Sequence, residues 1–101
     1  MKNVIAVLII SLAGCAADPS KALDAFGSAN TSEEELKCAH KLNDSHAQII
    51  VRLFDADHKA LDTAVAYQAP EKIVFVELQL GKKKVSRKVL NKKSIIALLS
   101  E

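Results

Sequence analysis

The sequence predicts a small α+β domain with an N-terminal helix, an antiparallel sheet of three to four strands and a short C-terminal helix. Three observations predict it: a helix start near residue 32, strand-like alternation over residues 72–80, and an apolar run at residues 94–99. A chain of 101 residues is long enough for one small domain and excludes a multidomain protein. We expect this domain to occupy residues 31–101.

Residues 1–14 have the three-part pattern of a secretory signal peptide. Lys2 lies beside the free amino terminus, residues 4–10 are all apolar, and small residues precede Cys15. A helix over the apolar run reaches only about half of the ~30 Å hydrocarbon core of a bilayer, since it rises about 1.5 Å per residue. We therefore expect a cleaved leader and no lasting transmembrane anchor.

The leader ends in Leu12, Ala13, Gly14 and Cys15. An aliphatic residue, two small residues and a cysteine in this order resemble the lipobox of bacterial lipoproteins. The resemblance implies that a lipoprotein signal peptidase recognises the first three residues and cuts before Cys15. It also implies a diacylglyceryl group on the Cys15 thiol and an N-acyl chain on the new amino group, with palmitate as an acyl label. Two or three acyl chains hold a soluble domain on a membrane durably, whereas a single chain is a marginal anchor.

Two alternatives to a lipoprotein stay open at this point: an ordinary signal peptide that places a cysteine at the first mature position, and an intact apolar helix. In lipoproteins of diderm bacteria, an aspartate directly after the cysteine resembles an inner-membrane retention signal. Here that position is Ala16, and Asp18 comes two residues later. This favours the periplasmic face of the outer membrane, with the inner membrane and the cell surface as alternatives.

Residues 15–30 contain many alanines, serines and aspartates together with Pro19 and Gly27, and show little periodicity. Such a composition predicts a flexible tether, on which Leu23 and Phe26 dock locally. We therefore expect the lipidated Cys15 to be separated from the folded domain by an irregular segment.

A helix is predicted over residues 32–46, with residues 43–45 as an alternative end. Two overlapping capping boxes begin it, Thr31 with Glu34 and Ser32 with Glu35. Acidic side chains in the first turn are also favoured by the helix dipole.

Residues 49–54 are β-branched and short, which predicts a strand, and residues 55–59 have turn composition. Apolar and polar residues alternate over residues 60–68, so a second strand there would complete a hairpin. A helix through the alanines of this segment is the alternative. Pro70 closes either element.

Residues 72–80 form the clearest strand, and apolar ends on both faces suit a central position in the sheet. Gly81 begins a turn into a polar strand over residues 84–90, whose lysines are typical of a sheet edge. Residues 94–99 then predict a short helix that is capped near Asn91 and packs on the sheet.

The sequence predicts neither a metal site nor catalytic residues. Candidate zinc ligands are Cys38, His40, His46 and His58. The first two lie about 200° apart on a helix, and paired cysteine spacing is absent. Asp55 and Asp57 fail the calcium-loop pattern, because Ala66 occupies the position that needs a bidentate acid.

Cys38 lacks a motif that would supply the base and oxyanion site of a thiol nucleophile. If Cys15 carries lipid, no other cysteine of the chain is left to pair with Cys38. We therefore expect either a thiol buried between helix and sheet or an intermolecular disulfide.

Charge is distributed unevenly. Residues 71–101 carry eight basic and three acidic side chains, whereas residues 16–70 carry five basic and nine acidic ones. A predicted cationic contact patch consists of Lys82, Lys83, Lys84, Arg87, Lys88, Lys92 and Lys93. Such a patch attracts polyanions, anionic headgroups or acidic protein surfaces. The alternative is a soluble edge strand that offsets the acidic half. Nucleic acid is not an expected partner, because no aromatic residues alternate with the lysines.

These observations predict a membrane-anchored lipoprotein without enzymatic activity, which acts as an adaptor or accessory subunit and binds an envelope protein complex in the periplasm. No small-molecule substrate is evident. The alternative is an inhibitor or immunity-type lipoprotein that blocks an enzyme or toxin through its hairpin loops.

Overall fold

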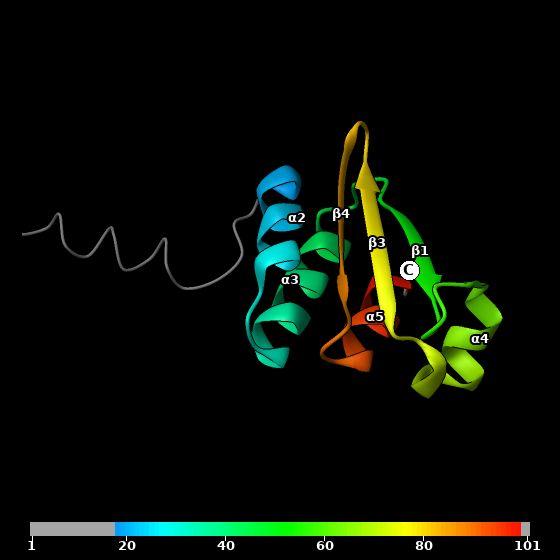
Figure 1. The fold of residues 1–101 in the computed structure, drawn as a ribbon. Coiled ribbons are helices and arrows are strands. Elements are labelled where there is room, and N and C mark those ends of the chain that lie inside the picture. The colour runs from blue at the N-terminus through cyan, green and yellow to red at the C-terminus, as the bar shows by residue number, and fades with distance from the viewer. Residues whose placement is uncertain (1–17, 100–101) are drawn as a thin grey trace, which may run out of the picture.

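The computed structural model describes residues 18–99, which form helices and a four-stranded antiparallel sheet (Figure 1). The strand order is β2-β1-β3-β4. The predicted α+β class is therefore confirmed. The signal peptide, the lipobox and the first residues of the predicted tether lie outside the described residues. No helix within residues 18–99 is long and apolar enough to span a membrane.

The first described element is a helix, α2 (Pro19–Ser28), where the sequence predicts a flexible tether. Asp18 caps it, because its Oδ1 accepts a hydrogen bond of 2.8 Å from the Ser20 N–H. Leu23 and Phe26 are fully buried. The prediction of a tether over residues 15–30 is therefore wrong for residues 19–28, and the local docking of these two side chains is confirmed. Burial of an apolar stripe stabilises a segment whose composition alone indicates a loop.

The next helix, α3 (Ser32–Asp44), begins and ends close to the predicted positions. Its capping box is the one formed by Thr31 and Glu34: the Glu34 N–H donates to Thr31 Oγ1 at 3.1 Å, and Glu34 Oε1 accepts from the Thr31 N–H at 3.3 Å. Glu35, the acid of the second predicted box, points inward and is fully buried. The helix takes the earlier of the two predicted ends.

Strand β1 (Ile50–Phe54) is confirmed, and the segment after it differs from the main prediction. Only Ala60–Leu61 forms a strand, β2, and Thr63–Gln68 forms the helix α4. Asp62 caps this helix by accepting from the Val65 N–H at 3.4 Å. The predicted strand over residues 60–68 is therefore wrong beyond Leu61, and the alternative helix is correct. A short 3₁₀ helix, η1 (Pro70–Lys72), leads into the next strand.

Strand β3 (Phe75–Leu80) lies between β1 and β4 (Lys83–Lys88), so its predicted central position and the predicted edge position of β4 are both confirmed. Gly81 makes the turn between them with a φ of +62°, a left-handed conformation that suits glycine. The chain ends in α5 (Lys92–Leu99), where Asn91 Oδ1 accepts from the Lys93 N–H at 3.0 Å. The predicted terminal helix and its cap are confirmed.

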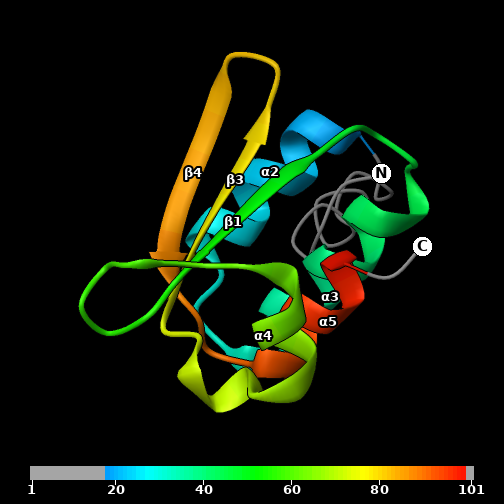
Figure 2. The same ribbon diagram turned by 90° about the vertical axis from the view of Figure 1, so that its right-hand side faces the viewer.

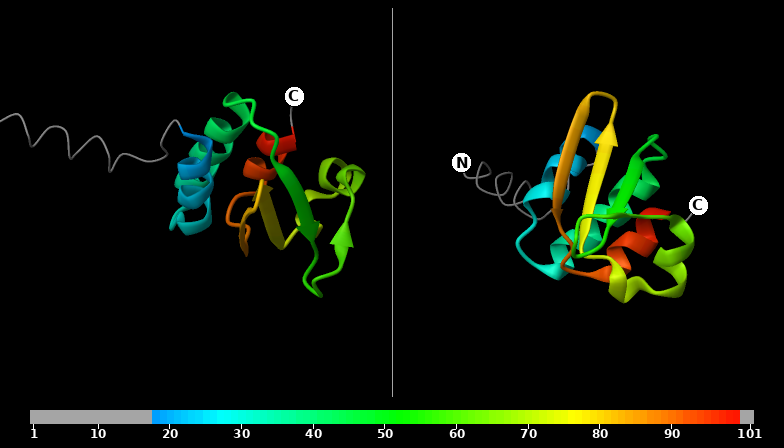
Figure 3. Two further views of the ribbon diagram at one scale, coloured as in Figure 1. Left: turned by 90° about the horizontal axis from the view of Figure 1, so that it is seen from above. Right: turned by 45° about the vertical axis from the view of Figure 1, so that its right-hand side comes forward.

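Helices α2, α3 and α5 lie on one side of the sheet, and within residues 18–99 no helix lies over the other side of β3 and β4 (Figures 2 and 3). The core forms where the helices meet the inward side chains of the strands. Its largest members are Leu23, Phe26, Leu42, Leu53, Ile73, Val76, Leu78 and Ile95. Helix α5 contacts α3 most extensively and α4 less, so the prediction that it packs on the sheet is wrong in that its main partner is a helix.

Candidate functional site

We call the side of the sheet that no described helix covers the open face. Side chains alternate along a strand, so every second residue of β1, β3 and β4 reaches this face. In the pairing register, Phe75 lies between Phe54 of β1 and Lys88 of β4. These three residues lie at the far end of the sheet, opposite the β3–β4 turn at Gly81.

A depression of about 430 Å³ lies on the open face at this far end, and we call it the aromatic depression. Its lining includes Phe54, His58, Phe75, Glu77 and Lys88. The imidazole of His58 stacks on the ring of Phe75, with 4.1 Å between ring centroids and 15° between ring planes. A partly exposed aromatic surface beside a lysine can receive a ligand group that is both apolar and acidic.

The β1–β2 turn holds His58 in this position. Asp55 Oδ1 accepts hydrogen bonds of 2.9 Å from the N–H groups of Asp57 and Lys59, while the His58 N–H donates to the Asp55 carbonyl at 2.9 Å. His58 has a φ of +63°. The Lys59 N–H is the largest cause that holds the pKa of the Asp55 carboxyl below its ordinary value; desolvation opposes it, and the Asp57 N–H adds to the lowering. The two aspartates thus belong to a hydrogen-bonded turn, as the turn composition of residues 55–59 predicts.

An ion pair crosses the open face next to the aromatic depression. Arg52 Nη1 lies 2.8 Å from Glu77 Oε2 and also donates to Gln79 Oε1 at 2.9 Å. The pair is partly exposed, so it contributes at most about 1 kcal/mol to stability. It joins two long side chains across the neighbouring strands β1 and β3.

The structure divides the predicted cationic contact patch into two groups. Three members are held within the fold: Lys83 by Ser20 and Asp24, Arg87 by Glu35 and the Phe26 carbonyl, and Lys92 by the Ile73 carbonyl. The other four, Lys82, Lys84, Lys88 and Lys93, are exposed, and their ammonium groups make no ion pair with another described residue. The predicted patch is therefore not one surface.

These four exposed lysines lie at two ends of the sheet. Lys82 and Lys84 lie at the β3–β4 turn, which we call the hairpin end, and Lys88 and Lys93 lie at the far end. The division follows from strand alternation, because Lys83 and Arg87 point toward α2 while Lys84 and Lys88 point to the open face.

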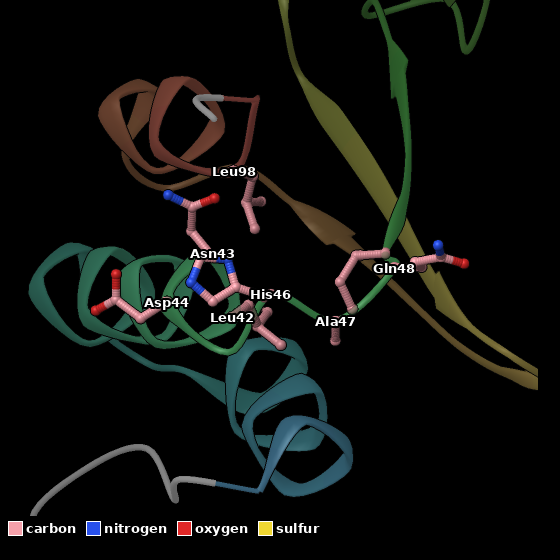
Figure 4. A pocket seen from close by; sticks show the side chains of 8 residues that line it. Leu42, Asn43, Asp44, His46, Ala47, Gln48 and Leu98 are labelled. Carbon is pink, nitrogen blue, oxygen red and sulfur yellow. The ribbon is translucent and has the colours of Figure 1, made fainter.

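A second depression, of about 530 Å³, lies where α3 and α5 end and β1 begins (Figure 4). His46 and Asn43 border it beside Leu98, while the side chains of Asp44 and Gln48 point away on opposite sides. The His46 imidazole and the Asn43 amide can form hydrogen bonds there, and the lining contains no serine, threonine, cysteine or lysine that could act as a nucleophile. We therefore take the aromatic depression, and not this second depression, as the candidate site.

The four candidate metal ligands are dispersed. Among residues 18–99, no three His, Cys, Asp or Glu side chains gather in an arrangement that holds a metal ion. Cys38 lies within α3 with 2% of its surface exposed, so its predicted burial is confirmed. The prediction of a buried thiol is nevertheless wrong, because Cys38 is not a free thiol in the structure. Cys15, the other cysteine of the chain, lies outside the described residues.

The aromatic depression was not among the predicted site residues. The signal was present, because the alternation over residues 72–80 places Phe75 with Glu77 and Gln79 on the side away from Val76 and Leu78. What the sequence alone does not contain is the tertiary partner: the turn that brings His58 onto Phe75 belongs to another strand pair.

Comparison with known proteins adds no name to this site. No family model matches the chain, and no curated protein or solved structure matches it either.

Proposed function

We propose that the protein is a lipid-anchored envelope lipoprotein without enzymatic activity, which acts as an adaptor or accessory subunit for an envelope protein complex in the periplasm. The lipobox resemblance of residues 12–15 supports the anchor. The observation that carries the binding role is the His58–Phe75 stack on an open sheet face.

The position of the aromatic depression fits an adaptor. Lys83 contacts Ser20, which lies five residues after Cys15, so the hairpin end is the end nearest the proposed anchor. The depression lies at the other end of the same strands. A domain anchored through Cys15 thus has a surface free to meet a periplasmic partner.

The surface also has the composition of a binding site. Aromatic side chains are enriched at the centres of protein interfaces, where they supply a large contact area at low entropic cost. Here Phe54, Phe75 and His58 supply that area, and Lys88 adds a cation at the rim. The partner surface that fits it is apolar at its centre with an acidic group beside it.

Crosslinking in cells tests the binding role. A photoreactive phenylalanine analogue replaces Phe75 at the aromatic depression or Lys37 on the exposed side of α3 as the matched control. We expect a discrete adduct with a component of an envelope complex from position 75 and none from position 37. An adduct with a soluble hydrolase, together with loss of that enzyme's activity, would favour the inhibitor alternative. Equal adducts from both positions would exclude the depression as the binding surface.

The anchor is tested separately by palmitate labelling of wild type and of Cys15→Ser. We expect the wild-type protein to take up label and to fractionate with the outer membrane, and the variant to do neither. A variant that still takes up label and stays with membranes would refute the lipid anchor.

A further inference from the structure

The hairpin end lies beside the start of the described chain. Lys83 Nζ lies 2.9 Å from Ser20 Oγ and 2.8 Å from Asp24 Oδ2, which joins β4 to the first turns of α2. The views in Figures 1 and 2 both place the β3–β4 turn at the same end of the molecule as the start of α2. The next lysines along the strand pair, Lys82 and Lys84, are exposed there.

Helix α2 and strand β4 are packed together along their length, so this proximity is fixed. Arg87 Nη1 donates to the Phe26 carbonyl at 2.6 Å near the other end of α2. Gly27 approaches β4 so closely that a Cβ on it would lie 3.1 Å from the Cβ of Val85. The hairpin end and the start of α2 are therefore joined by direct contacts.

Covalent geometry limits the distance between the start of α2 and an anchor at Cys15. Three peptide units separate Cys15 from Asp18, and a fully extended chain spans at most about 3.6 Å per residue, or about 11 Å in all. This is close to the Debye length of about 8 Å at physiological ionic strength. An anchor at Cys15 thus keeps Asp18, and the hairpin end that contacts the first turns of α2, within a distance of the same order as the Debye length from the membrane surface.

We propose that Lys82 and Lys84 contact the anionic phosphate headgroups of the membrane to which Cys15 is anchored. This inference rests on the proposed lipid anchor. The contact orients the domain with its hairpin end toward the bilayer and the aromatic depression away from it. Each well-placed lysine at an anionic surface raises occupancy about fivefold, so the pair is worth roughly thirtyfold.

Other charges at the hairpin end leave this attraction in place. Asp24 is paired with Lys83. Asp18 and Asp44 are exposed at this end, and Lys21 and Lys41 are exposed on the neighbouring turns of α2 and α3. The two acids are thus offset by two further cations, which leaves the positive charge of Lys82 and Lys84 in excess.

Amine labelling tests the orientation. The lipidated protein is reconstituted in phosphatidylethanolamine vesicles with or without phosphatidylglycerol, and a water-soluble acylating reagent labels its exposed lysines. Mass spectrometry then compares Lys82 and Lys84 with Lys59 and Lys72, two exposed lysines at the far end. We expect labelling of Lys82 and Lys84 to fall severalfold with phosphatidylglycerol and to recover at high salt, while Lys59 and Lys72 stay unchanged.

Each outcome decides the inference. If the Cys15 peptide from the same sample carries no lipid, both the proposed anchor and the proposed orientation are refuted. Lipid on Cys15 with equal labelling of all four lysines refutes the orientation alone. Protection in intact cells but not in vesicles assigns the lysines to an acidic protein instead of lipid. The paired charge reversal K82E/K84E should abolish the protection of the neighbouring lysines against acylation. The pair K59E/K72E, which makes the same charge change at the far end, should leave that protection in place.

Discussion

At the scale of single residues, the most consequential side chain is the buried carboxylate of Glu35. Its two oxygens accept from the N–H groups of Leu90 and Asn91 and from the Ser94 hydroxyl at 2.7–3.0 Å. Arg87 Nε lies 3.3 Å from Oε2. The group thus joins α3 to the start of α5 and to β4. The sequence offers both Glu34 and Glu35 as capping residues, and only these distant partners decide which of them turns inward.

Replacing Glu35 with alanine should destabilise the fold by about 3–5 kcal/mol, because it removes a fully buried carboxylate that accepts three hydrogen bonds and pairs with the largely buried Arg87 guanidinium. Urea unfolding measures the change as a lower midpoint with an unchanged slope. The control is Glu33→Ala in the same first turn, which removes only a helix-dipole interaction and should cost about 0.3–1 kcal/mol. Equal losses in the two variants would show that the Glu35 network does not stabilise the domain.

Asp55 should make the β1–β2 turn sensitive to acid. The N–H groups of Lys59 and Asp57 lower the pKa of its carboxyl in the folded state, so its contribution to stability is present above the ordinary pKa and is lost as pH falls through the folded value. Amide chemical shifts of Asp57 and Lys59 should therefore titrate with a midpoint below 3.8, the ordinary value. Asp55→Asn should abolish that titration, and a wild-type midpoint above 3.8 would contradict the hydrogen-bonded turn.

At the scale of elements, β3 and β4 were more predictable than α2 and α4. The alternation of β3 is a local pattern that one face of a sheet requires, so its central position follows from the residues themselves. Helices α2 and α4 have alanine-rich sequences with turn-forming residues, and their stability comes from the faces they bury. Phe26 in α2 and Ala66 in α4 are both fully buried in the hydrophobic core cluster, which contains residues from distant parts of the chain. Such tertiary burial overrides local propensity and is not visible in a single segment.

Phe26→Ala tests whether α2 belongs to the folded domain. A buried phenylalanine replaced by alanine costs about 3–5 kcal/mol, so the thermal midpoint and the urea midpoint should both fall sharply. Lys21→Ala changes an exposed position of the same helix and should stay within about 0.5 kcal/mol of wild type. If residues 19–28 were a tether, the two variants would be equally stable.

At the scale of the whole molecule, the fold reassigns charges that the sequence presents as one run. Seven cations between residues 82 and 93 predict a single contact patch. The sheet turns alternate residues toward the helices, where Lys83 and Arg87 bind α2, and separates the exposed lysines to opposite ends. The number of cations can be counted in the sequence. Which of them are held within the fold and which are exposed depends on the strand register and on α2, whose helical state was not predicted. The aromatic depression was missed because the turn that brings His58 onto Phe75 belongs to another strand pair.

The chemical state of the two cysteines provides a test of the proposed lipid anchor. A thiol of Cys15 that carries a diacylglyceryl thioether cannot also pair with Cys38, which is not a free thiol in the structure. We expect mature protein from membranes to show lipid on the Cys15 peptide and no mass change of that peptide on reduction. Cys38→Ser should leave the lipid in place, whereas Cys15→Ser should remove it. A lipid-free Cys15 joined to Cys38 and released by reduction would instead indicate a secreted domain closed by one disulfide, and would refute the anchor on which the proposed orientation depends.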